Sequence, residues 1–350
     1  GAYTSTAIGA DGLAIISYWD YDNSRVKVAH CDNTACTTPT TSTIDSLGVG
    51  GKYTSIAIGA DGLAIISYQD WTQDNLKVAH CDNIACTTST TSSIDATADQ
   101  VGWWTSITIG ADGLAIISYY DSSNIALKVA HCTNTACTTA TTSTIDTGNV
   151  GWTTSITVGT DGLAIISYYD FTNAQLKVAH CTNAACTSHD TPSTIDTVGT
   201  VDWYSSITIG ADGLAIISYA DDTNGHLKVA HCANTVCSTA TVSTIDNTGI
   251  DSNGIDAGAT TSITIGADGL PIVSYYDVTN GHLKLAHCDT TACVSATTSS
   301  IDAAGNVGRW ASIAIGVDNL PIISYYDTTN GDLKVAHVRH TAWAPHGWGR

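Results

Sequence analysis

The sequence predicts an all-β fold, a seven-bladed β-propeller whose four-stranded antiparallel blades each correspond to one repeat of about 50 residues. A string of the form Ser-Ile-Ala-Ile-Gly-Ala-Asp-Gly-Leu-Ala-Ile-Ile-Ser-Tyr recurs seven times in the 350 residues. In every copy a His follows 25 residues after the first Ser, whereas the return from that His to the next Ser varies in length. The length changes therefore lie in one connecting loop. The seven first serines are Ser5, Ser55, Ser106, Ser155, Ser206, Ser262 and Ser312.

The first half of each repeat predicts two strands joined by a tight turn, as the third copy illustrates. Residues 106–109 (Ser-Ile-Thr-Ile) alternate between polar and apolar side chains, which is typical of a strand (strand A). Residues 110–113 (Gly-Ala-Asp-Gly) have the composition of a turn. Residues 114–119 (Leu-Ala-Ile-Ile-Ser-Tyr) form an apolar run rich in β-branched side chains, which indicates a strand buried on both faces (strand B).

The second half predicts another turn and two more strands. A polar stretch such as residues 277–281 (Asp-Val-Thr-Asn-Gly) is typical of a turn. Residues 127–131 (Leu-Lys-Val-Ala-His) predict strand C, and the Thr-rich residues 141–145 predict a half-exposed outer strand D. Four strands per repeat without a helical period favour a propeller over an open β-solenoid, whose repeats are usually shorter.

The whole chain, residues 1–350, is expected to form one propeller domain, because a chain of this length can bury about three quarters of its unfolded surface. The last repeat departs from the pattern, since residues 338–345 replace the Thr-rich strand D. Either this tail forms the last outer strand, or the seventh blade has an exposed edge through which the protein could self-associate. The repeats lie at about 1–50, 51–101, 102–150, 151–201, 202–257, 258–307 and 308–350.

The 12 Cys residues form six pairs of the spacing Cys-x4-Cys, each directly after strand C. The seventh repeat has Val338 and Trp343 at the equivalent positions, so both members are absent together, as expected of a bonded pair. A zinc site would need a fourth ligand, and none recurs. We therefore predict six disulfides and an oxidising compartment, which means a secreted, periplasmic or cell-surface protein. The pairs are Cys31–Cys36, Cys81–Cys86, Cys132–Cys137, Cys181–Cys186, Cys232–Cys237 and Cys288–Cys293.

Acidic side chains dominate the charge: all 32 are Asp, against 12 Lys and Arg, and the net charge is −20. Nucleic acids recruit Lys and Arg to their phosphates, so this balance argues against a nucleic-acid partner. No run of about 18 apolar residues occurs, so no membrane insertion is expected.

Most charged residues recur at fixed positions of the repeat, which favours structural roles. Asp follows the strand A turn, closes strand B and closes strand D, where we expect it to form turns with its own backbone. A ring of seven strand C imidazoles could bind metal or sense pH. The simpler expectation is a half-buried His that is hydrogen-bonded inside each blade. These residues are His30, His80, His131, His180, His231, His287 and His337.

Aromatic side chains gather before strand A and after strand B, in connections that are expected to open on one face of a propeller. Rings beside Asp can stack on a sugar and hydrogen-bond its hydroxyls. The alternative is that the rings are wedges between blades, and we prefer it for the Tyr that closes strand B in every copy. The candidate ligand-binding residues are Trp19, Asp20, Asp70, Trp71, Trp103, Tyr120, Asp121, Trp152, Tyr169, Asp170, Trp203 and Trp310.

The connection between the fifth and sixth repeats is six residues longer than the standard one and alternates Asp and Asn around Gly. Asp251, Asn253 and Asp256 could supply oxygen ligands to Ca²⁺ there, the one cofactor that the sequence suggests. The loop lacks a full EF-hand pattern and its closing Glu, so a solvated acidic loop is the alternative.

Residues 323–336 (Ile-Ser-Tyr-Tyr-Asp-Thr-Thr-Asn-Gly-Asp-Leu-Lys-Val-Ala) resemble the repeats of secreted bacterial propellers of the sialidase-like (BNR) type, and similar strings cover the whole chain. This resemblance implies a propeller fold and either a polysaccharide-active enzyme or a non-catalytic binding module. The chain departs from sialidases because it lacks the Ser-x-Asp-x-Gly-x-Thr-Trp box, a cluster of Arg, and any Glu.

Together these features predict a secreted, non-catalytic binding or scaffold protein whose favoured ligands are neutral glycans. One alternative is a structural protein that self-assembles through its irregular seventh blade. The other is a polysaccharide-active glycosidase or lyase.

Overall fold

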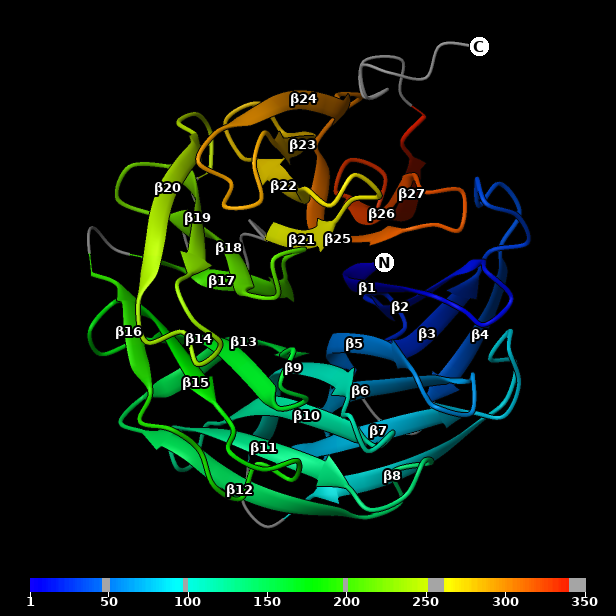
Figure 1. Cartoon of the computed structure of the whole chain (residues 1–350). Helices are drawn as coiled ribbons and strands as arrows, with labels where there is room; N and C mark the ends of the chain where they lie inside the picture. Colours follow the sequence, from blue (N-terminus) through cyan, green and yellow to red (C-terminus); the bar gives the residue numbers. More distant parts are fainter. Residues whose placement is uncertain (46–50, 97–99, 198–200, 251–260, 340–350) are drawn as a thin grey trace.

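A computed structural model of the chain shows seven antiparallel β-sheets in a closed ring, in which the orange and red seventh blade lies beside the blue first blade (Figure 1). The structure describes residues 1–45, 51–96, 100–197, 201–250 and 261–339, without the side chains of residues 201–203. None of these residues belongs to a helix that could cross a membrane. The predicted seven-bladed β-propeller is confirmed.

Within each blade the strands follow the chain from the axis outward, in the order A to D. Blade 1 contains β1 (Ala2–Ile8), β2 (Ala14–Asp20), β3 (Arg25–His30) and β4 (Thr40–Asp45). Blade 2 contains β5 (Lys52–Ile58), β6 (Ala64–Asp70), β7 (Asn75–Cys81) and β8 (Ser89–Asp95). Blade 3 contains β9 (Val101–Ile109), β10 (Ala115–Asp121), β11 (Ala126–Cys132) and β12 (Ala140–Thr147). Blade 4 contains β13 (Val150–Val158), β14 (Ala164–Asp170), β15 (Gln175–His180) and β16 (Ser193–Asp196).

The last three blades repeat this order, and blade 7 has three strands among the described residues. Blade 5 contains β17 (Val201–Ile209), β18 (Ala215–Asp221), β19 (His226–Cys232) and β20 (Ala240–Asp246). Blade 6 contains β21 (Thr261–Ile265), β22 (Pro271–Asp277), β23 (His282–Cys288) and β24 (Ala296–Asp302). Blade 7 contains β25 (Val307–Ile315), β26 (Pro321–Asp327) and β27 (Asp332–His337).

Burial follows the predicted pattern of each strand. Every residue of β10 is buried, as expected of a strand B with neighbouring blades on both faces. The outer strand β12 exposes most of its Thr side chains and buries Ile145 between blades. The turn from strand A to strand B is closed by Asp112, whose Oδ1 accepts the backbone N–H of Leu114 over 3.1 Å.

The contact between two neighbouring blades, here called a seam, is held near the axis by one recurring hydrogen bond. The Oγ of the first Ser of each blade accepts a backbone N–H from the inner strand of the next blade over 3.0–3.2 Å. This bond occurs in all seven seams, so the ring is closed by the same contact that builds it. The pairs are Ser5–Ile56, Ser55–Ile107, Ser106–Ile156, Ser155–Ile207, Ser206–Ile263, Ser262–Ile313 and Ser312–Thr6.

A second layer of hydroxyls lies behind the first in six seams. The buried Ser of strand B meets a Thr or Ser of the next inner strand over 2.6–2.9 Å. In the sixth seam Ala311 stands at the Thr position, and the buried Ser274 hydroxyl has no hydrogen-bond partner in the described part of the chain. The pairs are Ser17–Thr54, Ser67–Thr105, Ser118–Thr154, Ser167–Ser205, Ser218–Thr261 and Ser324–Thr4.

Six seams carry a third link, in which the Asp that closes strand D binds a Tyr and a Lys of the next blade. Asp95 accepts the Tyr119 hydroxyl over 2.6 Å and the Lys128 ammonium over 2.5 Å. The expected turn role of this Asp is therefore only part of its function, because its main partners lie in another blade. The six sets are Asp45–Tyr68–Lys77, Asp95–Tyr119–Lys128, Asp146–Tyr168–Lys177, Asp196–Tyr219–Lys228, Asp246–Tyr275–Lys284 and Asp302–Tyr325–Lys334.

The strand C histidines lie inside their own blades, as predicted, and in five blades the Nε2 forms a hydrogen bond, whereas His131 and His337 approach their Asp without the geometry of one. In each blade the His Nε2 lies 2.7–2.9 Å from the Oδ2 of the Asp in the strand A turn. The other oxygen of that carboxylate holds the turn itself, as Asp11 does for the backbone N–H of Leu13. The His and Asp series therefore brace the A–B turn against strand C in every blade.

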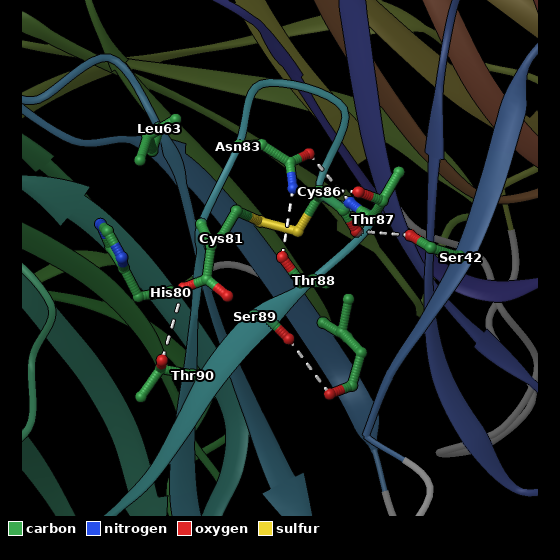
Figure 2. Close-up of a disulfide and its surroundings, with 12 residues drawn as sticks. Ser42, Leu63, His80, Cys81, Asn83, Cys86, Thr87, Thr88, Ser89 and Thr90 are labelled. Carbon is green, nitrogen blue, oxygen red and sulfur yellow. Dashed lines mark hydrogen bonds between the residues drawn. A yellow bond between two sulfur atoms is a disulfide. The ribbon is translucent and has the colours of Figure 1, made fainter.

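All six predicted disulfides are present, with Cα atoms 4.7–4.9 Å apart. Each closes a short loop at the end of strand C. Figure 2 shows the Cys81–Cys86 loop of blade 2, where Ser42 of the preceding blade donates its hydroxyl to the Cys86 carbonyl over 2.6 Å. The loop therefore also contacts the outer strand of the preceding blade.

Replacing one Cys pair, Cys132→Ala with Cys137→Ala, is expected to lower the free energy of unfolding by about 2 kcal/mol, because a small loop is no longer closed in the unfolded chain. Urea unfolding followed by tryptophan fluorescence would measure this. A reducing agent should destabilise the unmodified protein more than this double substitution does. An unfolding midpoint that is the same with and without the reductant would contradict the structural role of the disulfides.

Asp246→Asn tests the third seam link. Burial favours a higher pKa for Asp246, but hydrogen bonds from Lys284 and Tyr275 outweigh it and hold the pKa of this carboxyl below its usual range. We expect the free energy of unfolding to fall by about 2 kcal/mol at pH 7, because the half-buried Lys284 loses its closest carboxylate and keeps only Asp277, 4.0 Å away.

The pH dependence of this loss has a definite sign. A lowered pKa in the folded state gives stability above the unfolded pKa of about 4, which is lost as the pH falls through the folded pKa. The difference between Asp246→Asn and the unmodified protein should therefore shrink between pH 4 and pH 2 in urea titrations. The exposed Asp32→Asn is the matched control and should change little at either pH.

Candidate functional site

The inner strands of all seven blades surround a cavity of about 170 Å³ on the axis. Its walls have three tiers, because three consecutive residues of strand A face it in six blades, and the described Thr261 and Ser262 face it in blade 6. The tier at the mouth holds Thr153 in blade 4 and is otherwise aromatic, with Tyr3, Tyr53, Trp104, Tyr204 and Trp310. The next two tiers are the Thr and Ser residues of the seams.

A β-bulge in strand A aims the mouth tier at the axis. Tyr3, Trp104 and Trp310 have φ angles of 53°, 48° and 50°, in the left-handed region that side chains other than Gly rarely adopt. The pairing register between strands A and B shifts at the same place. A bulge turns a side chain out of the ordinary alternation along a strand. The adjacent Trp103 and Trp104 therefore belong to two different groups of aromatic side chains.

The group that contains Trp103 lies farther from the axis and continues the aromatic surface outward. Trp152 stacks on Phe171 with ring centroids 4.5 Å apart, and Trp71 lies 5.2 Å from Trp103. Lys52 lies over Trp71 and Trp19, with Nζ 4.3 and 5.2 Å from their ring centroids. Trp104 contacts both Trp103 and Trp152 and links the two halves of this surface. We call Tyr21, Trp19, Trp71, Trp103, Trp152 and Phe171 the aromatic crescent.

The crescent breaks the seven-fold symmetry, because it covers blades 1 to 4. Its exposed members are Tyr21, Trp71 and Phe171, which follow the Asp that closes strand B and are 65%, 41% and 40% exposed. The same position holds Ser122 in blade 3, and Asp222, Val278 and Thr328 in blades 5, 6 and 7. A row of exposed rings on one side of the mouth is typical of a binding surface rather than of blade packing.

Several indole N–H groups in this region lack a protein acceptor. The Nε1 atoms of Trp19, Trp103, Trp104 and Trp310 are buried and without a hydrogen-bond partner in the described part of the chain. Trp152 differs, because its Nε1 donates to Asn149 Oδ1 over 3.0 Å, and Tyr120 donates to the same oxygen. Because the four unpaired nitrogens are buried, they belong to the packing between the rings and not to a surface that a ligand could contact directly.

The predicted ring residues are brought together, but the predicted aspartates are not open to a ligand. Asp70, Asp121 and Asp170 are 3%, 0% and 3% exposed and cap the turn after strand B, as Asp121 does for Asn124. Asp20 makes the same turn with Asn23 and is less buried. Tyr120 and Tyr169 are also buried, beneath Trp152 and Phe171.

Trp310 and Trp203 differ from the other predicted Trp residues. Trp310 belongs to the mouth tier of the cavity with Trp104, whereas Trp103 and Trp152 belong to the crescent.

The side chain of Trp203 and the proposed calcium ligands Asp251, Asn253 and Asp256 lie outside the described residues, so the calcium site stays a prediction. Among residues that the structure describes, no cluster of three acidic, His or Cys side chains could hold a metal.

The predicted site residues did not include six rings that the structure places there, namely Tyr21, Phe171, Tyr3, Tyr53, Trp104 and Tyr204. Repeat spacing carries the missing signal for the mouth tier: its members stand two residues before the first Ser of each blade, and Trp103 and Trp152 stand three before it. Only the bulge separates these two positions in space. Tyr21 and Phe171 follow the same spacing as Trp71 relative to strand B.

The chemistry available at the mouth is that of rings and hydroxyls. The described lining of the cavity consists of Tyr, Trp, Thr, Ser and Ala, without Asp, His, Lys or Arg. Glycoside hydrolysis ordinarily needs two carboxyl groups beside the bond that breaks. The described mouth therefore offers stacking surfaces and hydroxyl hydrogen bonds.

No protein-family model and no curated protein matches the sequence. Solved structures are similar in fold, and one is a protein of unknown function from Dyadobacter fermentans, with 10% identity, a TM-score of 0.60, and coverage of 96% of this chain and 93% of that one. The α-L-arabinofuranosidase of Fusarium graminearum with arabinobiose has 15% identity, a TM-score of 0.55, and coverage of 83% and 93%. An ulvan lyase has 9% identity, a TM-score of 0.59, and coverage of 96% and 93%. At these identities the likeness shows the propeller fold alone.

Proposed function

We propose that this chain is a secreted, non-catalytic binding protein whose aromatic crescent takes neutral oligosaccharides. The carrying observation is the run of partly exposed rings over blades 1 to 4, beside a channel mouth lined by hydroxyls. Apolar faces of sugar rings stack on aromatic side chains, and their hydroxyls accept indole N–H groups. A net charge of −20 disfavours anionic glycans.

Secretion is part of this proposal and rests on the six disulfides. Such bonds persist in oxidising compartments and are rare in reducing ones. The local loops that they close leave no free Cys in the chain. Recovery of the disulfide-bonded protein outside the producing cells would support this location.

A polysaccharide-active enzyme is the second candidate, because structures of similar fold include an arabinofuranosidase and an ulvan lyase. Incubation with a panel of arabinans, ulvan and neutral glucans, followed by chromatography of released sugars, tests this reading. We expect no product from any of them. Release of oligosaccharides at a rate that scales with protein concentration would replace the binding proposal by an enzymatic one.

Trp71→Ala and Phe171→Ala are expected to weaken oligosaccharide binding about tenfold each, because each removes an exposed stacking surface. Their free energy of unfolding should change by about 0.5 kcal/mol or less, as is usual for exposed positions. A glycan array with calcium and again with chelator would identify the ligand, and isothermal titration calorimetry would measure the affinities.

Thr328→Ala and Val278→Ala are matched controls, since they occupy the equivalent position in the blades outside the crescent. Neither should alter binding. If both ring variants unfold the protein, or bind as tightly as the unmodified chain, the crescent is packing and the proposal fails. Calcium dependence in the array would support a metal site in the loop after Asp246.

A further inference from the structure

The first Ser of each blade has hydrogen-bonding capacity that the seams do not use. A Ser hydroxyl can donate one hydrogen bond and accept two. In each seam its oxygen accepts one backbone N–H, as Ser106 does from Ile156. In the part of the chain that the structure describes, no acceptor receives the proton of this hydroxyl in any of the seven seams. Each of these serines can therefore still donate one hydrogen bond and accept one.

These seven serines line the axial cavity and are its most accessible polar side chains. Each of them is half-buried, whereas Thr105 and Thr154 of the next tier are only 6% and 7% exposed. The inner strands that carry the serines surround the axis (Figure 1). The Ser tier is therefore a ring of hydroxyls that a molecule in the cavity can reach from every side.

The Thr hydroxyls behind this ring are already paired. Thr54 donates to the Tyr3 carbonyl over 2.8 Å and lies 2.9 Å from the Ser17 hydroxyl, which therefore donates to it. Thr4 likewise donates to the Trp310 carbonyl over 2.7 Å. The hydrogen bonds that remain available to a ligand come mainly from the Ser tier.

The mouth tier places aromatic side chains beside the Ser tier. The ring centroid of Tyr3 lies 4.7 Å from that of Tyr53 and 4.8 Å from that of Trp310. Tyr53 lies 5.4 Å from Trp104 by the same measure. Blade 4 has the smaller Thr153 at this position. Among the described residues of the tier, the mouth is therefore least filled at blade 4.

The size and charge of the cavity limit what it can hold. A cavity of about 150 Å³ can hold benzene, so the axial cavity of about 170 Å³ has room for one six-membered ring. An ion would meet no side chain of opposite charge in the described lining. A neutral molecule with several hydroxyls matches the Ser tier, because each hydroxyl both donates and accepts.

We propose that the axial cavity binds one neutral cyclic polyol, a monosaccharide or a cyclitol, at a site separate from the aromatic crescent. The hydroxyls around the edge of such a ring bond to the first Ser of several blades. One face of the ring lies toward the aromatic tier, since the apolar face of a sugar packs well on Tyr and Trp. Binding of an oligosaccharide to the crescent is not required.

Saturation-transfer NMR with the full chain tests the proposal, with myo-inositol and methyl β-glucoside as the probes. Binding is detected directly, because polyols also raise unfolding temperatures through their exclusion from protein surfaces. We expect saturable binding, and the tighter probe identifies a cyclitol or a monosaccharide as the ligand. Cyclohexanol has the same ring size and one hydroxyl, so it should bind about tenfold more weakly.

Two substitutions test whether the probe lies in the cavity. Ser155→Ala should weaken binding about fivefold, because the ligand loses one hydrogen bond. Thr153→Tyr should abolish binding, because the added ring fills the mouth. The backbone accepts this change, since Tyr3 and Tyr53 have φ angles of 53° and 58° at the same position and Thr153 has 47°.

Ser93→Ala on the outer strand β8 is the matched control, since it removes an exposed hydroxyl away from the cavity. It should bind the probe as the unmodified chain does, and circular dichroism would verify that all three variants fold.

No saturable binding of either probe would overturn the proposal and leave water as the content of the cavity. Equal affinity for cyclohexanol would also overturn it, because the Ser tier would then contribute nothing. Binding that survives Thr153→Tyr would overturn it as well, and its loss in Trp71→Ala would assign the polyol to the crescent. A glycan array without any signal would contradict only the crescent, so the two proposals can fail separately.

Discussion

The structure depends on the hydrogen bonds that cross its seams. The first Ser of each blade binds a backbone N–H of the next inner strand, and this bond recurs in all seven seams, including Ser312 to Thr6 where no chain connects the blades. Because this hydrogen bond has nearly the same length in every seam, the inner strands form a regular wall around the axis. The channel, its hydroxyl tiers and the position of its aromatic mouth all follow from that wall.

Regularity is also why function is best sought where the repeats differ. The recurring Asp, Tyr, Lys and His side chains form hydrogen bonds within turns and seams, as Asp95 does with Tyr119 and Lys128. The crescent departs from seven-fold symmetry, and so does blade 7, which has three strands among the described residues. The crescent adds exposed rings to blades 1, 2 and 4, and no ring stands at the same position in blades 5, 6 and 7.

Local patterns were sufficient for much of the molecule. The strands, the A–B turns, the six disulfides and the histidines bound within their blades were predicted, because each rests on residues close in sequence or on the repeat itself. The role of the strand D Asp was only partly predicted, since its Tyr and Lys partners lie in another blade. Asp70 and Asp121 were expected at a ligand surface, but their carboxylates are buried in the turns that they cap.

The sequence by itself determined the number of blades, the order of strands and the covalent links, because periodicity and spacing are properties of a single chain. Only the tertiary structure decided which rings share a surface. A bulge sends Trp104 to the cavity and leaves its neighbour Trp103 in the crescent. Closure of the ring packs Leu333 into the same cluster as Ile16, more than 300 residues away in sequence. These placements arise from backbone geometry and ring closure, which bring together residues that no local pattern relates.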